Sequence, residues 1–173
     1  MKRLLILSLV FFGCTQEIGN SIYYSSWEES MDVGNGLGSI IFIGNKSNGY
    51  TSYDRILVYS DVESYYKKNN KLYVKQKFND SLFINLCHAV MQLNNTTLPM
   101  NLPIEVNGII SETKDSNLVI EKIKNSEYFK RMNNGEFHYY IIDIPKRKIE
   151  GVYNLENFKE KIDEKTILSD LEK

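Results

Sequence analysis

The strongest constraint on the fold is the segment of residues 53–78, where two runs rich in aromatic and β-branched residues flank Asn69-Asn70. Asparagine tolerates the left-handed backbone that tight two-residue turns require, so the segment predicts a β-hairpin. In the second run, residues 71–77, apolar and aromatic residues alternate with lysines. We therefore expect one apolar face and one lysine-rich face, which is typical of an antiparallel sheet.

Further segments predict additional strands and helices. Short apolar or aromatic runs bounded by turn residues predict strands at residues 21–27, 39–43, 137–143 and 148–153. Apolar residues at helical spacing predict helices over residues 78–93, over residues 115–132 and after Asn154. The expected N-caps are Asp80 or Ser81, Asp115 or Ser116, and Asn154.

These elements predict an α+β fold class, with an antiparallel sheet of hairpins and two or three helices in a single domain. The domain is expected to span residues 21–173, with residues 79–136 as a helical insertion between two strands. The last residues, 163–173, are highly charged, and we expect them to fray.

The N-terminus follows the layout of a secretory signal. Lys2 and Arg3 precede a mostly apolar run at residues 4–12 that is too short to span a bilayer as a mature anchor. Gly13-Cys14 follows, and a small residue directly before a cysteine resembles the bacterial lipobox, in which that cysteine is acylated with fatty acids such as palmitate.

The resemblance to a lipobox implies a lipoprotein signal peptide at residues 1–13, a lipid attachment site at Cys14 and a tether at residues 14–20. A plain transmembrane stub or an uncleaved signal anchor is the alternative. Cleavage before Cys14 would leave 160 of the 173 residues and remove two cations, so the net charge would change from −1 to −3. Such a domain has no overall positive charge with which to bind nucleic acid.

Two strand patterns, Lys-Leu-Tyr-Val-Lys-Gln at residues 71–76 and Tyr-Tyr-Ile-Ile-Asp at residues 139–143, occur together with the lipobox. With the strand and helix expected after them, the chain resembles a family of small uncharacterised bacterial lipoproteins that carry a domain of unknown function. Residues 79–136 stand where that family has a short link. The resemblance implies an envelope location and a β core, and it supplies no activity or catalytic residues.

Cysteine and histidine offer little for catalysis or metal binding. Cys87 and His88 are adjacent, and neighbouring positions of a helix do not face each other, so the two side chains cannot share a proton. If Cys14 is acylated, Cys87 has no disulfide partner and is either a buried thiol or an exposed reactive one. Together with His138, these residues show no metal-ligand spacing.

The other polar motifs give equally weak evidence for catalysis or ligand binding. The carboxylate pairs Glu28-Glu29 and Asp61 with Glu63 lie in no recognisable motif, and such groups are usually solvated. The glycine-rich run at residues 34–38 has neither the Lys-Ser/Thr of a phosphate loop nor the spacing of a dinucleotide site. We therefore expect no catalytic residue, no cofactor and no metal.

Tyrosine is the most informative surface residue, because the chain contains 12 of them, many within the expected strands. A tyrosine ring is large and rigid, which suits contacts with proteins or glycans. The candidate binding surface consists of Tyr65, Tyr66, Tyr73 and Tyr139. The alternative is that these rings simply pack on a half-buried sheet.

The sequence thus favours a membrane-anchored bacterial lipoprotein of the cell envelope that faces the periplasm or the exterior. Its expected role is a non-enzymatic binding or accessory module, attached to the membrane through lipid on Cys14, with an envelope protein or glycan as partner and no nucleic acid. An envelope hydrolase that uses dispersed carboxylates and an immunity or inhibitor lipoprotein are the two alternatives.

Overall fold

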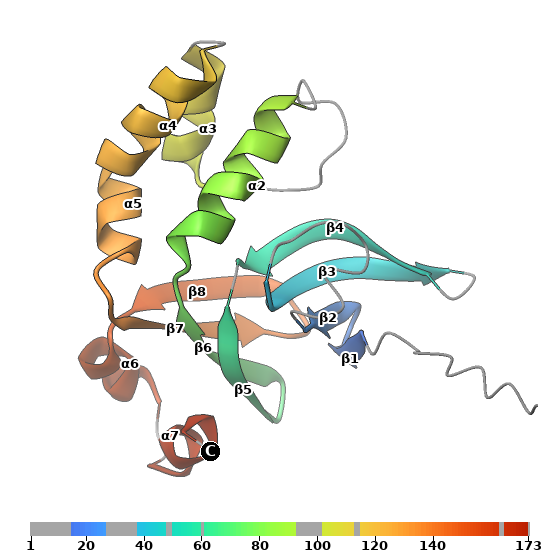
Figure 1. The fold of residues 1–173 in the computed structure, drawn as a ribbon. Helices are drawn as coiled ribbons and strands as arrows, with labels where there is room; N and C mark the ends of the chain where they lie inside the picture. The colour runs from blue at the N-terminus through green and yellow to red at the C-terminus, as the bar shows by residue number, and fades with distance from the viewer. Residues whose placement is uncertain are drawn as a thin grey trace, which may run out of the picture.

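The computed structural model of the chain describes residues 15–26, 38–47, 50–59, 61–92, 102–112, 115–162 and 165–172. These residues form two four-stranded antiparallel sheets and six helices (Figure 1). The predicted α+β class is confirmed, but the described residues contain more helices than the two or three expected. No helix among them is both long enough and apolar enough to cross a bilayer.

The first sheet has the strand order β1-β2-β3-β4. Its strands are β1 (Gln16–Gly19), β2 (Ile22–Ser25), β3 (Ile40–Ser47) and β4 (Tyr50–Val58). The expected first strand is shorter than predicted, and the predicted strand at residues 39–43 extends further, into a long hairpin with β4. Residues 27–37, which hold most of the glycine-rich run, lie outside the described residues.

Strand β1 corrects the expectation of a tether at residues 14–20. Gln16 pairs with Tyr24 of β2, and Ile18 is only 8% exposed. Lys67 of the second sheet donates a hydrogen bond from Nζ to the Ile18 carbonyl oxygen at 2.6 Å. A polar sequence forms a strand here because the neighbouring chain supplies its hydrogen-bond partners, so the sheet begins two residues after Cys14.

The second sheet has the strand order β5-β6-β7-β8. Its strands are β5 (Val62–Lys68), β6 (Lys71–Lys77), β7 (Phe137–Asp143) and β8 (Lys148–Tyr153). The predicted hairpin is confirmed, since Asn69 has φ = 54° and Lys68 pairs with Lys71 across the turn. The last two strands have the predicted bounds.

Among the described residues, four helices lie between β6 and β7. They are α2 (Asp80–Gln92), α3 (Ile104–Glu112), α4 (Ser116–Asn125) and α5 (Glu127–Met132). Neither Asp80 nor Ser81 caps α2, because Asn79 Oδ1 accepts from the Leu82 backbone N–H at 3.2 Å. Asp115 caps α4 as expected, but the predicted long helix is interrupted at Ser126, whose backbone is extended and whose side chain caps α5.

The C-terminus forms α6 (Leu155–Lys161) and α7 (Lys165–Leu171). Asn154 caps α6 as predicted. The expectation that residues 163–173 fray is wrong for the described part of the tail, since Ile167 and Leu171 are each only 2% exposed. These two residues are four positions apart, so they lie on one face of α7 and pack against the sheet despite the charged sequence around them.

Three hydrophobic clusters join the elements of the fold. The middle cluster packs one face of the first sheet against one face of the second, with Ile22, Ile41, Leu72 and Ile142 fully buried. Helices α2–α5 cover the other face of the first sheet, and α6 and α7 cover the other face of the second (Figure 1). The helical insertion at residues 79–136 therefore belongs to the core of the single domain.

Polar contacts also fasten the two sheets together at one end. Asn20, in the β1–β2 turn, donates from Nδ2 to the Ile144 and Pro145 carbonyl oxygens at 2.9 and 3.1 Å. Arg147 Nε donates to the Asn20 carbonyl oxygen at 3.0 Å, and Arg55 Nη2 donates to the Arg147 carbonyl oxygen at 2.7 Å. This set of contacts, which we call the Asn20 clasp, holds the first turn of the fold against the β7–β8 turn.

The packing of α7 gives a stability prediction. Leu171→Ala should lower the free energy of unfolding by about 2–5 kcal/mol, because it leaves a cavity in a filled core. Ser169→Ala, at an exposed position of the same helix, should change it by less than about 0.5 kcal/mol. Urea denaturation of both variants tests this, and equal stabilities would show that α7 does not pack.

Candidate functional site

The tyrosines predicted to form a binding surface divide between the two faces of the second sheet. Tyr66, Tyr73 and Tyr139 belong to the cluster under α6 and α7, where Tyr73 is 8% exposed and Tyr139 is 5% exposed. The Tyr139 ring stacks on Phe158 of α6 with 4.8 Å between ring centroids. These rings pack mainly against the core under α6 and α7.

Tyr65 lies on the opposite face of the sheet. Its ring centroid is 5.0 Å from that of Tyr24, and its hydroxyl donates to Gln16 Oε1 at 2.6 Å. It therefore joins the two sheets near β1. The structure does not bring the four predicted tyrosines together, because successive positions of a strand point to opposite faces.

Cys87 and the histidines do not form a reactive site. Cys87 is fully buried, and burial raises the pKa of its thiol to about 12. His138 is 4% exposed, and its Nε2 lies 2.7 Å from the Met132 carbonyl oxygen. Within the described residues, no group of three or more histidine, cysteine, aspartate or glutamate side chains is arranged to hold a metal ion.

Of the carboxylate pair Asp61 and Glu63, only Asp61 has a structural role shown by its hydrogen bonds. Asp61 Oδ2 accepts from Asn79 Nδ2 at 2.8 Å, and its carbonyl oxygen accepts from the Lys77 N–H at 3.0 Å. Asp61 thus fixes the start of α2 against the sheet, while Glu63 is exposed. Cys14, the pair Glu28-Glu29 and residues 34–37 lie outside the described residues.

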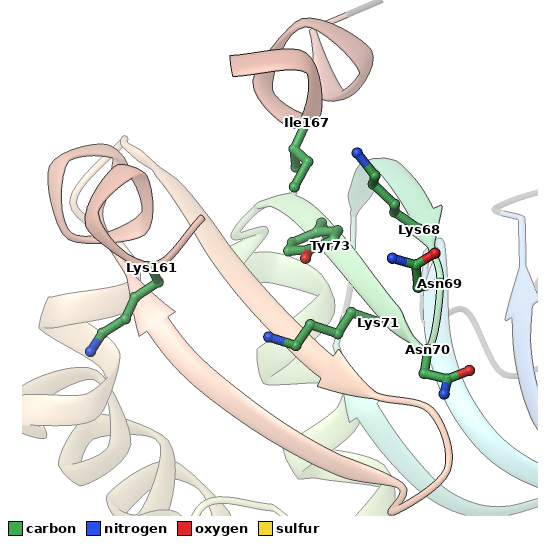
Figure 2. Close-up of a pocket in the computed structure, with 7 residues that line it drawn as sticks. All are labelled: Lys68, Asn69, Asn70, Lys71, Tyr73, Lys161 and Ile167. Atoms are coloured by element: carbon green, nitrogen blue, oxygen red, sulfur yellow. The ribbon is translucent and has the colours of Figure 1, made fainter. Parts of the chain in front are cut away.

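A basic hollow opens where the β5–β6 hairpin meets the C-terminal helices. Figure 2 shows the side chains that line it. Its volume is about 290 Å³. It is lined by Lys68, Asn69, Asn70, Lys71, Tyr73, Lys161 and Ile167. Among the described residues that line it, three are cationic and none is acidic.

The strand register explains why the lysines gather there. Lys68 pairs with Lys71, and Tyr66 pairs with Tyr73, so all four side chains project from the same face of the hairpin. The apolar residues of α7 pack over the tyrosine pair, whereas at the end of the hairpin Lys68 is half-buried and Lys71 is exposed. Figure 2 shows Ile167 above the Tyr73 ring, with Lys68 on one side and Lys71 reaching past the ring.

The walls of the basic hollow are held by hydrogen bonds. The Asn70 carbonyl oxygen accepts from the Ile144 N–H at 2.9 Å, which fixes the hairpin turn to the β7–β8 turn. Ser64 Oγ donates to the Leu171 carbonyl oxygen at 2.6 Å, which ties the end of α7 to β5. The hollow is therefore formed before any ligand arrives, which lowers the entropic cost of binding.

On the other side of β6, Lys71 pairs with an acidic residue, Asp143 of β7. That carboxylate accepts from the Lys146 N–H at 2.9 Å, and Lys146 Nζ lies 3.5 Å from it. The backbone hydrogen bond from Lys146 is the main cause of its lowered pKa, and Lys71 contributes a smaller electrostatic effect. Asp143 therefore interacts chiefly with its own turn.

A second hollow, of about 510 Å³, lies between the start of β7 and the start of α6. It is lined by Glu136, Phe137, Tyr139, Asn154, Leu155 and Glu156. Lys75 Nζ lies 4.1 Å from the centre of the Phe137 ring, so a cation already occupies one face of that ring. With both signs of charge around it, this hollow favours no single class of ligand.

Sequence reasoning identified the hairpin but not the basic hollow at its end. The pairing of Lys68 with Lys71 follows from a two-residue turn at Asn69-Asn70, so this signal was available in the sequence. Lys161 and Ile167 reach the site only through the packing of the last two helices, which no local pattern reveals.

Comparison with known proteins adds no relative from which a role could be taken. No protein-family model, no curated protein and no solved structure matches the chain.

The burial of Cys87 gives a prediction for thiol chemistry. In the full chain carrying Cys14→Ser, alkylation of Cys87 by iodoacetamide at pH 8 should be at least about a hundredfold slower than after unfolding in urea, because the buried thiol stays protonated and inaccessible. Mass spectrometry of the alkylated peptide measures both rates. Similar rates in the folded and unfolded chains would contradict the burial of Cys87.

The same burial predicts a loss of stability in alkaline solution. Burial raises the pKa of the Cys87 thiol from its ordinary value of 9.0 to about 12. The buried, neutral thiol therefore makes its full contribution to the free energy of unfolding below pH 9.0. This contribution is lost as the pH rises toward about 12. Urea denaturation over this range should show a smaller decline for Cys87→Ala than for the chain with Cys87, and equal declines would contradict the effect.

Proposed function

We propose that the chain is a lipoprotein of the bacterial cell envelope, held on a membrane by acyl groups on Cys14, and that it acts as a non-enzymatic binding module. The observation that carries the proposal is the order of the first 14 residues, in which two cations, an apolar run and Gly13-Cys14 follow one another. This is the layout of a cleaved signal that ends at a lipid attachment site.

The position of β1 supports an anchored domain. Gln16, the first residue of β1, follows Cys14 by two residues, which extended chain covers in about 7 Å. The folded domain would then lie close to the membrane surface. Several acyl chains on one cysteine hold a protein almost permanently, since each buried methylene contributes about 0.8 kcal/mol.

The character of the hollows supports binding as the role. The basic hollow offers ammonium groups and carboxamides as hydrogen-bond donors, with a tyrosine ring beside them. Cys87 and His138, which could serve as nucleophile and base, are both buried and lie in packed surroundings. A preformed open hollow that presents donors suits ligand recognition.

Acylation of Cys14 is the direct test. Cells expressing the full chain should incorporate an alkyne-labelled fatty acid into it, and mass spectrometry should place the label on a peptide that begins at Cys14. The membrane fraction should contain the protein, and Cys14→Ser should abolish both the label and the membrane association. Cys87→Ala is the matched control, which should retain both.

Crosslinking in intact cells tests the binding role. A specific partner recovered with the native chain and lost with Cys14→Ser would support a membrane-held binding module. An unmodified Cys14 would refute the anchor, and hydrolysis of an envelope substrate by the purified chain would refute the non-enzymatic role.

A further inference from the structure

We propose that four cations around the Asn20 clasp, Arg55, Lys67, Lys146 and Arg147, form a surface that rests on anionic phospholipid headgroups. We call them the clasp cations. The inference rests on the proposed function and deepens it, because it states which end of the anchored domain meets the bilayer and which class of lipid it prefers.

Hydrogen bonds gather three of these cations around the turn between β1 and β2. Lys67 Nζ donates to the Ile18 carbonyl oxygen at 2.6 Å, and Arg147 Nε donates to the Asn20 carbonyl oxygen at 3.0 Å. Arg55 Nη2 donates to the Arg147 carbonyl oxygen at 2.7 Å. Side chains from β4, β5 and the β7–β8 turn therefore meet at the end of the two sheets where β1 and β2 lie (Figure 1).

The charges of these three side chains are not neutralised by the bonds that hold them. Their acceptors are carbonyl and carboxamide oxygens, which carry no net charge. Within the part of the chain that the structure describes, Arg55, Lys67 and Arg147 form no ion pair with a carboxylate, and Arg55 Nε is buried without a hydrogen-bond partner. Like charges gathered at one place repel one another, so an adjacent layer of negative charge would stabilise the arrangement.

Lys146 adds an exposed charge directly before Arg147 in the β7–β8 turn. Its side chain is 75% exposed, and its Nζ lies 3.5 Å from Asp143 Oδ2. Ion pairs on such exposed sites are weak, so the ammonium group of Lys146 keeps most of its attraction for other anions.

Two further carboxylates near the clasp are directed elsewhere. Glu17 of β1 pairs with Tyr23, whose ring packs beneath α2–α5, so Glu17 lies on the face of the first sheet that is turned away from the second sheet. Asp54 accepts hydrogen bonds from Asn45 and Ser52, toward the tip of the β3–β4 hairpin. Positive charge therefore predominates where the two sheets meet at the clasp.

The position of the anchor places this surface near the bilayer. Asn20 follows Cys14 by six residues. Extended chain covers at most about 20 Å over that distance. Strand β1, attached through its first residue, can stand away from the membrane or lie along it. Since charges are screened beyond about 8 Å at physiological ionic strength, only the second orientation brings the clasp cations within range of the headgroups.

The anchor also explains why a few cations are sufficient. Acyl groups hold the domain at the surface, so the headgroups are present at a high effective concentration. The clasp cations then have only to select an orientation. Each lysine or arginine near an anionic surface strengthens the association about fivefold, so four of them favour the orientation with β1 along the membrane.

Amine labelling of the acylated native chain tests the orientation. The protein is purified from membranes, reconstituted into vesicles of phosphatidylcholine with or without phosphatidylglycerol, and treated with an acetylating reagent. Lys146 should react at least about fivefold more slowly when phosphatidylglycerol is present, because the anionic headgroups cover it. Lys124, which is exposed on α4, is the internal control and should react at the same rate in both kinds of vesicle.

Vesicle sedimentation tests the lipid preference on the full chain carrying Cys14→Ser, so that the result does not depend on acylation. Association with vesicles that contain phosphatidylglycerol should exceed association with phosphatidylcholine at least about tenfold and should fall as salt is added. Residues 1–13 are the same in every variant compared, so their own contribution to membrane binding cancels.

Matched variants in the same chain assign the surface. Lys67→Gln/Lys146→Gln leaves both arginine contacts of the clasp in place and should weaken the association with phosphatidylglycerol at least about tenfold. Lys124→Gln/Lys159→Gln removes the same charge from exposed positions of α4 and α6 and should bind normally. If the first double variant does not fold, Lys146→Gln alone replaces it and should weaken the association about fivefold.

The two proposals fail separately. Equal association with both lipids, equal binding by the two double variants, or equal labelling of Lys146 in both kinds of vesicle overturns the inference and leaves the anchor. A preference for phosphatidylglycerol that requires Lys67 and Lys146, found together with an unmodified Cys14 in cells, supports the clasp cations and refutes the anchor.

Discussion

The pairing of β6 with β7 is the constraint on which the rest of the structure depends. The two strands pair residue by residue from Lys71 with Asp143 to Lys77 with Phe137, although four helices separate them in the chain. Closing so long a loop costs chain entropy, and the cost is offset because β6 and β7 are buried on both faces by the first sheet and by the C-terminal helices. Once they pair, both ends of the insertion are fixed, and helices α2–α5 are positioned to cover the first sheet.

Burial on both faces also explains why tyrosine is so frequent in the strands. A tyrosine ring can fill an apolar layer while its hydroxyl reaches a polar group at the boundary. Tyr140 does this when its hydroxyl donates to Gln76 Oε1 at 2.7 Å between two buried side chains. Burial raises the pKa of Tyr140 well above its ordinary value, so this hydroxyl remains a hydrogen-bond donor at any physiological pH.

Features set by neighbouring residues were predictable from the sequence. The turn at Asn69-Asn70, the caps Asp115 and Asn154, and the bounds of β7 all follow from local backbone preferences and alternation. Features that depend on residues distant in the sequence were not predictable in this way. Strand β1 has a polar sequence and exists because β2 pairs with it.

The same distinction applies to the candidate site. The alternation in β6 predicted a lysine-rich face, and the structure places Lys71 and Lys75 on that face around Tyr73. What the alternation could not show is that two apolar residues of α7, within a highly charged tail, cover the middle of this face. That cover turns an open row of lysines into a bounded hollow at one end.

The Asn20 clasp bears on how the domain responds to mechanical load. A pull on the chain from its N-terminal side, as from a membrane anchor, reaches β1 first, and β1 is a short strand at the edge of its sheet. Asn20 and Arg147, together with the hydrogen bond from Lys67 to Ile18, pass part of that force into the second sheet. Peeling β1 from its sheet therefore requires breaking contacts with both sheets and not only its pairing with β2.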